Sequence, residues 1–124
     1  MLIIRDEQLA ALSEHSRRGF EDRAYEHLCK CWVRQCERFG EQAVRSFISY
    51  AIDKAGSYGV TTEKGVIRFL DTMFALGDQF DNDPELPWFL EILKDPEMPQ
   101  NIKMDRIWSE TKRIIKIGSP DKRG

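Results

Sequence analysis

Carboxylates and prolines crowd into residues 76–90, LGDQFDNDPELPWFL, where the helical patterns on either side are interrupted. The alternating carboxylates from Asp81 to Glu85 suggest a calcium loop. A loop of the helix–loop–helix class needs glycine at its sixth position and a bidentate glutamate at its twelfth. Counted from Asp81, those positions hold Leu86 and Ile92. The sequence therefore predicts no metal in this segment.

Two interpretations of the acidic segment remain. In the first, short side chains such as Asp83 bond nearby backbone N–H groups, while Phe80 and one face of Trp88 fold inward to pin the turn. In the second, the segment docks a protein, because loops often carry function and Trp is enriched at interface hot spots. The residues predicted for this docking surface are Asp78, Phe80, Asp81, Asp83, Glu85 and Trp88.

A second group with chemical potential is His27 and Cys31, which stand four apart on one face of a predicted helix. A structural zinc site needs four such ligands. The other cysteines, Cys29 and Cys36, do not complete one, because a helix turns Cys29 about 200° away from Cys31. All three cysteines are therefore predicted to pack as small apolar residues. Two histidines also indicate no nucleophilic triad unless the tertiary structure assembles one, and no enzyme activity, metal or cofactor is predicted.

The periodicity of apolar residues predicts the helices that hold these groups in place. Apolar side chains recur at three- and four-residue steps, no convincing β-run appears, and Gly40 and Gly77 stand where helices would end. The predicted helices are 6–39 (one long helix or two nearly collinear ones), 41–55, a third capped by Thr61 or Thr62 and closed by Gly77, 87–93 and 101–116. The sequence therefore predicts an all-α fold, a compact bundle of about five helices with the acidic, proline-containing loop between the third and the fourth.

Length and hydropathy define the organisation expected of the chain. A chain of 124 residues supports one core, so we expect a single helical domain over 1–117 and a flexible C-terminal tail over 118–124. Residues 2–4 could form a short extended start. The N-terminus lacks the basic region of a signal peptide, and no run approaches the roughly 20 apolar residues of a membrane span. We therefore expect a cytoplasmic protein that does not enter a membrane.

Charge is distributed unevenly along the chain. The formal net charge is −2, but residues 81–100 hold six acidic groups against Lys94 alone, a local net of 1 − 6 = −5. Residues 101–124 hold seven basic groups against three acidic, a net of 7 − 3 = +4. The broad basic face of a nucleic-acid binder is missing, and such a dipolar surface suits a protein partner better.

Several phrases, taken in order, resemble a known group of proteins. They are FEDR at 20–23, AI at 51–52 with YGVT at 58–61, LGDQFDNDP at 76–84, LPW at 86–88, IL at 92–93 and MDRI at 104–107. This order and spacing, over about residues 2–107, resembles short, poorly characterised bacterial proteins encoded beside type VI secretion genes for spike, PAAR-tip and effector proteins. No catalytic motif belongs to the resemblance.

The resemblance implies a cytoplasmic helper of a toxin or of a spike component. We therefore expect a non-enzymatic protein-binding module that acts as an accessory, adaptor or chaperone-like protein for a type VI secretion effector, PAAR or spike protein. The alternative is a cytoplasmic immunity protein that neutralises a cognate toxin, in which an acidic patch could block a basic active site. The −5 charge of residues 81–100 is compatible with either, and the oligomeric state stays open.

Overall fold

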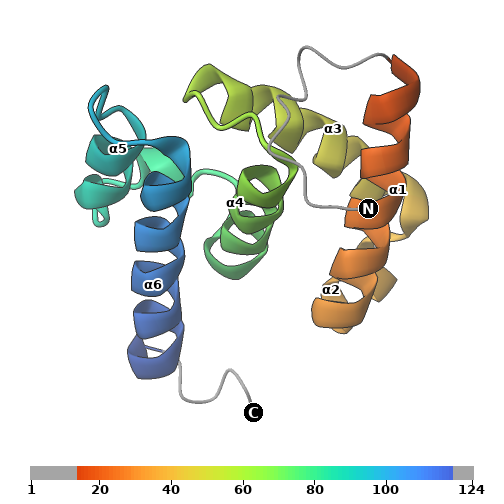
Figure 1. Ribbon diagram of the computed structural model, residues 1–124. Helices are drawn as coiled ribbons and strands as arrows, with labels where there is room; N and C mark the ends of the chain where they lie inside the picture. The colour runs from red at the N-terminus through yellow and green to blue at the C-terminus, as the bar shows by residue number, and fades with distance from the viewer. Residues whose placement is uncertain (1–13, 119–124) are drawn as a thin grey trace.

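The computed structural model describes residues 14–118, with side chains from 17 to 115. These residues form six α-helices and one 3-10 turn, and no strand occurs among them (Figure 1). The elements are α1 (Glu14–Cys31), α2 (Val33–Phe39), α3 (Glu41–Ser57), α4 (Glu63–Leu76), the turn η2 (Phe80–Asn82), α5 (Pro87–Leu93) and α6 (Gln100–Gly118). The predicted all-α fold is confirmed, with six helices where about five were expected.

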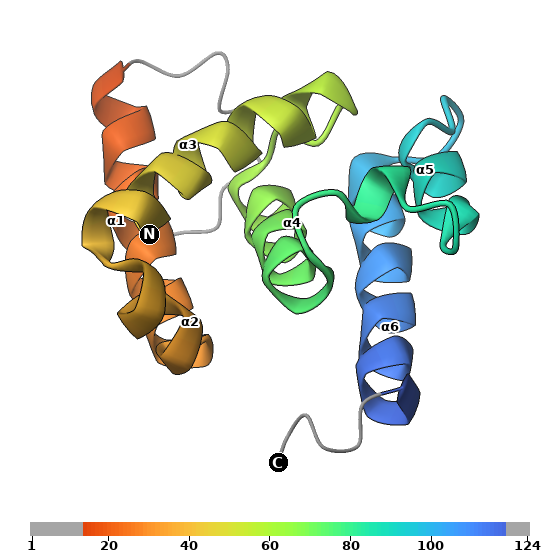
Figure 2. The same cartoon turned by 180° about the vertical axis from the view of Figure 1, so that it is seen from behind.

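The additional helix arises because the predicted helix 6–39 is divided into two helices, α1 and α2. The chain leaves helical geometry at Trp32, whose φ is −127° and ψ is 55°, whereas Gly19 lies within α1 without breaking it. Figure 2 shows the chain turning at the end of α1, so that α2 leads back toward the start of α3. The expectation of two nearly collinear helices is therefore wrong. The non-helical Trp32 lets its indole N–H reach a buried carboxylate on α4, as described below.

The core is built around α4, which lies between α1 and α3 on one side and α6 on the other (Figures 1 and 2). Fully buried side chains follow each helix at three- and four-residue steps, so each helix turns one apolar stripe inward. Burying one of the larger side chains, a Val, Leu, Ile, Phe or Met, stabilises the fold by about 1.5–3 kcal/mol. The central members are Val44, Ile48, Ala51, Ala55, Val66, Phe69, Leu70, Met104 and Ile107.

Local capping chemistry sets the start of α4. Of the two predicted caps the structure uses Thr62, whose hydroxyl accepts a hydrogen bond from the N–H of Gly65 at 3.1 Å. The side-chain carbonyl of Gln100 accepts hydrogen bonds from the N–H groups of Thr61 and Thr62, at 2.8 and 3.1 Å. Gln100 is the first residue of α6, so these bonds tie the starts of α4 and α6 together.

The acidic segment folds as a tight turn, η2, that packs against α4 and α5. Pro87 begins α5, as predicted, because a helix start needs no N–H from that residue. Phe80 lies between Phe69 and Phe89, with ring centroids 5.4 and 5.5 Å apart in edge-to-face geometry. This aromatic stack attaches η2 and α5 to the core.

Several expectations fall at the ends of the chain. The extended start at residues 2–4 and all but the first residue of the tail at 118–124 lie outside the described residues. Helix α6 continues to Gly118, two residues beyond the predicted end of the last helix. Within residues 14–118, every helix is too short or too polar to cross a bilayer.

Candidate docking surface beside α5

Two of the six residues predicted for the docking surface are interior residues. Phe80 is 1% exposed and Asp81 is 2% exposed, so neither can contact a partner directly. Phe80 takes the inward position of the first interpretation of the loop, within the aromatic stack. Asp81 follows neither interpretation, because its carboxylate bonds side chains of α3 and the residue after it instead of nearby backbone N–H groups.

Asp81 is the acidic member of a buried polar cluster. Its Oδ1 lies 2.9 Å from Lys54 Nζ, an ion pair whose alignment is too oblique for a hydrogen bond, while Tyr58 donates its hydroxyl hydrogen to Oδ2 at 2.5 Å. Lys54 also donates to the backbone carbonyl of Asp78 at 2.6 Å. Sequence reasoning missed Lys54 and Tyr58, because a lysine on a helix and a tyrosine after it carry no local mark of a partner 23 residues or more away.

Burial and charge perturb the groups of this cluster. Burial raises the pKa of Tyr58, and its hydrogen bond to the Asp81 carboxylate raises it further. Burial on its own would lower the pKa of Lys54, but the close approach of the Asp81 carboxylate outweighs this effect and the pKa is raised. Both shifts favour the protonated form, so the cluster joins η2 to α3 as a neutral Tyr58 and an ion pair.

The other predicted residues lie nearer the surface. Asp78, Glu85 and Trp88 are exposed, and Asp83 is half-buried. The Oδ1 of Asp83 accepts a hydrogen bond from the N–H of Glu85 at 2.9 Å, the local turn bond expected of a short acidic side chain. Trp88 is 37% exposed, so its ring is partly packed and partly available.

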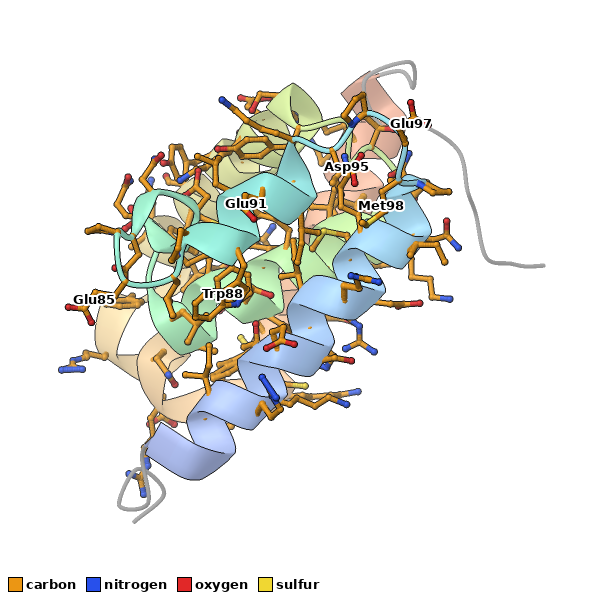
Figure 3. All side chains as sticks on the ribbon, turned by 90° about the vertical axis from the view of Figure 1, so that its left-hand side faces the viewer. Glu85, Trp88, Glu91, Asp95, Glu97 and Met98 are labelled. Atoms are coloured by element: carbon orange, nitrogen blue, oxygen red, sulfur yellow. The ribbon has the colours of Figure 1, made fainter. Side chains whose placement is uncertain are left out.

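Acidic residues continue along α5 and into the loop after it, beyond the predicted set; Glu85, Glu91 and Glu97 are exposed and Asp95 is half-buried. Figure 3 shows Glu85, Trp88, Glu91, Asp95, Glu97 and Met98 on the side of the molecule formed by α5 and the loops that flank it. We call Glu85, Trp88, Glu91, Asp95 and Glu97 the α5 surface. None of its four carboxylates forms an ion pair with another side chain between residues 17 and 115. The sequence analysis recognised the negative charge of residues 81–100, but it predicted a docking surface centred on the turn at residues 78–88.

An open groove of about 680 Å³ runs between α5 and α6 and includes Trp88. Ile92 lines it from α5, and Ile102, which is 42% exposed, lines it from α6. The remaining lining is polar, with Ser109 and the charged residues Glu91, Asp105, Arg106, Glu110 and Arg113. An aromatic anchor beside aliphatic side chains and a polar rim is the usual composition of a protein-docking groove.

A second buried carboxylate, on α4, organises the opposite part of the molecule. Asp71 is 3% exposed, and its Oδ1 lies 2.8 Å from His27 Nε2 and 2.9 Å from the indole nitrogen of Trp32. Arg68 lies 3.7 Å from the other oxygen. Sequence reasoning missed Asp71, although an acidic residue beside Leu70 in the apolar stripe of α4 was a signal that a buried partner had to exist.

The three cysteines differ in their surroundings. Cys36 is buried and Cys29 is half-buried, as predicted, but Cys31 is exposed, so the expectation of apolar packing is wrong for Cys31. Burial raises the pKa of the Cys36 thiol to about 11, with contributions from the adjacent Cys29. Within the described part of the chain, no three histidine, cysteine or acidic side chains are grouped as metal ligands.

Comparison of the chain with protein-family models, with curated proteins and with solved structures finds no match in any of the three.

Proposed function

We propose that this protein is a non-enzymatic adaptor that binds a protein partner through the α5 surface and the adjoining groove. The observation that carries the proposal is the exposed part of Trp88, which opens into the groove beside α6 and is flanked by carboxylates that form no ion pair within residues 17–115. A partly exposed aromatic ring is typical of interfaces, and carboxylates that pair with no side chain among residues 17–115 can complement the charge of a partner.

The charge of the α5 surface favours a basic partner. An exposed ion pair contributes only about 0.2–1 kcal/mol, so the carboxylates are expected to set orientation and association rate more than affinity. A buried aromatic anchor contributes about 2 kcal/mol or more, which makes Trp88 the main source of affinity. A lysine- or arginine-containing segment that covers Trp88 would satisfy both requirements.

The sequence resemblance supplies the biological context of the proposal. A type VI secretion effector, PAAR or spike protein is the proposed partner, held in the cytoplasm before export. Immunity to a cognate toxin remains the alternative, because the same acidic surface could cover a basic active site. The two functions differ in whether binding also protects the cell.

The first test replaces the aromatic anchor. Trp88→Ala should weaken binding to the co-expressed effector or spike protein about 30-fold, the equivalent of about 2 kcal/mol. Phe39→Ala is the matched control, because Phe39 is an aromatic residue 55% exposed on α2, away from α5. Titration calorimetry or a quantitative pull-down gives the affinities. Equal affinity for both variants and the native protein would exclude Trp88 as an anchor.

The second test changes charge without disturbing the core. Glu85→Lys with Glu91→Lys should slow association and reduce its dependence on salt, whereas Glu26→Lys with Glu37→Lys makes the same charge change on exposed positions of α1 and α2. Asp81 is unsuitable for charge reversal, because a lysine at this position would face Lys54, a like charge, in the interior.

A toxicity assay with the effector separates the two proposed functions: binding without protection supports the adaptor, and protection supports immunity. Absence of binding to effector, PAAR and spike proteins overturns both.

A further inference from the structure

The tertiary structure brings Cys31, His27 and Asp71 into a row, with His27 between the other two, that the sequence alone did not indicate. Cys31 Sγ lies 3.9 Å from His27 Nδ1, and His27 Nε2 lies 2.8 Å from Asp71 Oδ1. Cys31 and His27 are one turn apart on α1, whereas Asp71 comes from α4, 44 residues later in the chain. The two ring nitrogens therefore face different partners, which is the arrangement of a proton relay and not that of a metal chelate.

The hydrogen bonds at Asp71 determine which histidine nitrogen carries the proton. The indole of Trp32 can only donate, so the Oδ1 that it contacts at 2.9 Å is an acceptor. The same oxygen is the partner of His27 Nε2, which must then carry its hydrogen. Arg68 places a positive charge 3.7 Å from the other carboxylate oxygen. The lone pair of the neutral imidazole is consequently on Nδ1, directed at the thiol of Cys31.

Solvent exposure increases from Asp71 through His27 to Cys31. Asp71 is buried, the side chain of His27 is 31% exposed, and Cys31 is exposed at the last residue of α1. The carboxylate that orients the histidine is shielded from water, while the sulfur is open to a reagent.

We propose that Cys31 is a site of covalent modification by carbon electrophiles, with His27 as its base and Asp71 as the positioning residue for His27. In the step, the thiol proton moves to His27 Nδ1, the sulfur forms a bond to the electrophilic carbon, and the bond from that carbon to its leaving group breaks. With iodoacetamide the leaving group is iodide, and the proton passes from His27 to solvent. The inference is independent of the adaptor function, because α1 and α5 lie on opposite sides of α4 (Figure 1).

The size of the expected effect follows from thiol chemistry. An ordinary thiol is only about 3% thiolate at pH 7, so transfer of its proton to a base can raise the reactive fraction about 30-fold at most. A more acidic thiol is also a weaker nucleophile, which offsets much of that gain. A three- to tenfold acceleration of alkylation at pH 7 is therefore the range that the relay can provide.

The test compares alkylation rates of the full-length protein with iodoacetamide at pH 7, resolved for each cysteine by mass spectrometry. His27→Gln should slow the modification of Cys31 three- to tenfold, since glutamine can still donate to Asp71 but accepts no proton. Asp71→Asn should slow it as well, because an amide does not stabilise the imidazolium. Glu26→Gln is the matched control, an exposed change on α1 outside the relay, and should leave the rate unchanged.

A kinetic readout distinguishes the relay from simple exposure. Because His27 accepts the thiol proton in the step, alkylation of Cys31 in the native protein should be slower in D2O than in H2O, and this difference should be lost in His27→Gln and Asp71→Asn. Circular dichroism confirms that each variant remains helical. If Cys31 reacts no faster than glutathione, or if His27→Gln reacts as fast as the native protein while remaining folded, the proposal is overturned.

Discussion

At the scale of single residues, the acidic turn is secured by one carboxylate that no partner protein can reach. Asp81 is paired with Lys54, whose side chain is only 13% exposed, and bonded by Tyr58. Removing one member of a buried ion pair leaves the other charge without compensation, which costs about 3–5 kcal/mol in a fully buried pair. Asp81, although it lies among other acidic residues in the sequence, thus stabilises the fold, whereas the acidic residues after it lie nearer the surface.

The first stability prediction concerns this pair. Lys54→Met should lower the free energy of unfolding by about 2–4 kcal/mol, because Asp81 then keeps only the hydroxyl of Tyr58. Urea denaturation at pH 7 measures the change. Lys112→Met, the same substitution at an exposed position of α6, should stay within about 0.5 kcal/mol of the native protein. A loss below 0.5 kcal/mol in Lys54→Met would show that the pair contributes nothing to stability.

At the scale of elements, the start of α4 depends on a residue without a side chain. A Cβ built on Gly65 would lie 2.8 Å from Val60 Cγ1 and 3.0 Å from the capping hydroxyl of Thr62. Real Cβ atoms essentially never approach another atom as closely as 2.8 Å, so a side chain at residue 65 would force Val60 or the Thr62 cap to move. The sequence indicated the cap but not this contact, since Val60 and Gly65 meet only once the turn has formed.

The second stability prediction compares two helical glycines. Gly65→Ala should destabilise the protein by about 1–3 kcal/mol, because Val60 or the Thr62 cap must move. Gly56→Ala should stabilise it by up to about 1 kcal/mol, since a Cβ there meets nothing within 4 Å and alanine is the better helix former. Thermal melts monitored by circular dichroism rank the three proteins. Equal shifts of both variants in the same direction would contradict the packing argument.

At the scale of the whole molecule, burial of ionisable groups makes stability depend on alkaline pH. The Cys36 thiol has an ordinary pKa of 9.0 that burial raises to about 11, and the pKa of Tyr58 is raised as well. Above pH 9 the unfolded chain releases the thiol proton while the folded protein retains it. Because the unfolded state then binds fewer protons, stability falls as the pH rises from 9 to 11.

The alkaline prediction is tested with one variant and one control. The free energy of unfolding should be constant between pH 7 and 8 and decline between pH 9 and 11, with a shallower decline in Cys36→Ala, which has no thiol to ionise. Ile48→Val, which also removes buried volume, should lower stability by a similar amount at pH 7 and at pH 10. Identical slopes for Cys36→Ala and the native protein would remove Cys36 from the explanation.

The sequence by itself determined the helical class, most helix boundaries, a cap at Thr61 or Thr62, the start of α5 at Pro87 and the local turn bond of Asp83. These features depend on neighbours within about one helical turn, so their signals survive in the linear order of residues. It also identified the acidic excess of residues 81–100, but it left open whether Trp88 is exposed and centred the docking surface on residues 78–88.

Only the tertiary structure decided which polar side chains are buried and with whom. Asp81 became internal through Lys54 and Tyr58, and Asp71 contacts His27 of α1 and Trp32 of the break after α1, which lie 44 and 39 residues earlier in the chain. The same packing bent the chain at Trp32 and left Cys31 in solvent beside His27. A charge repays its burial only when a partner lies within a few ångströms, and that proximity is created by helix packing, which no spacing in the sequence records.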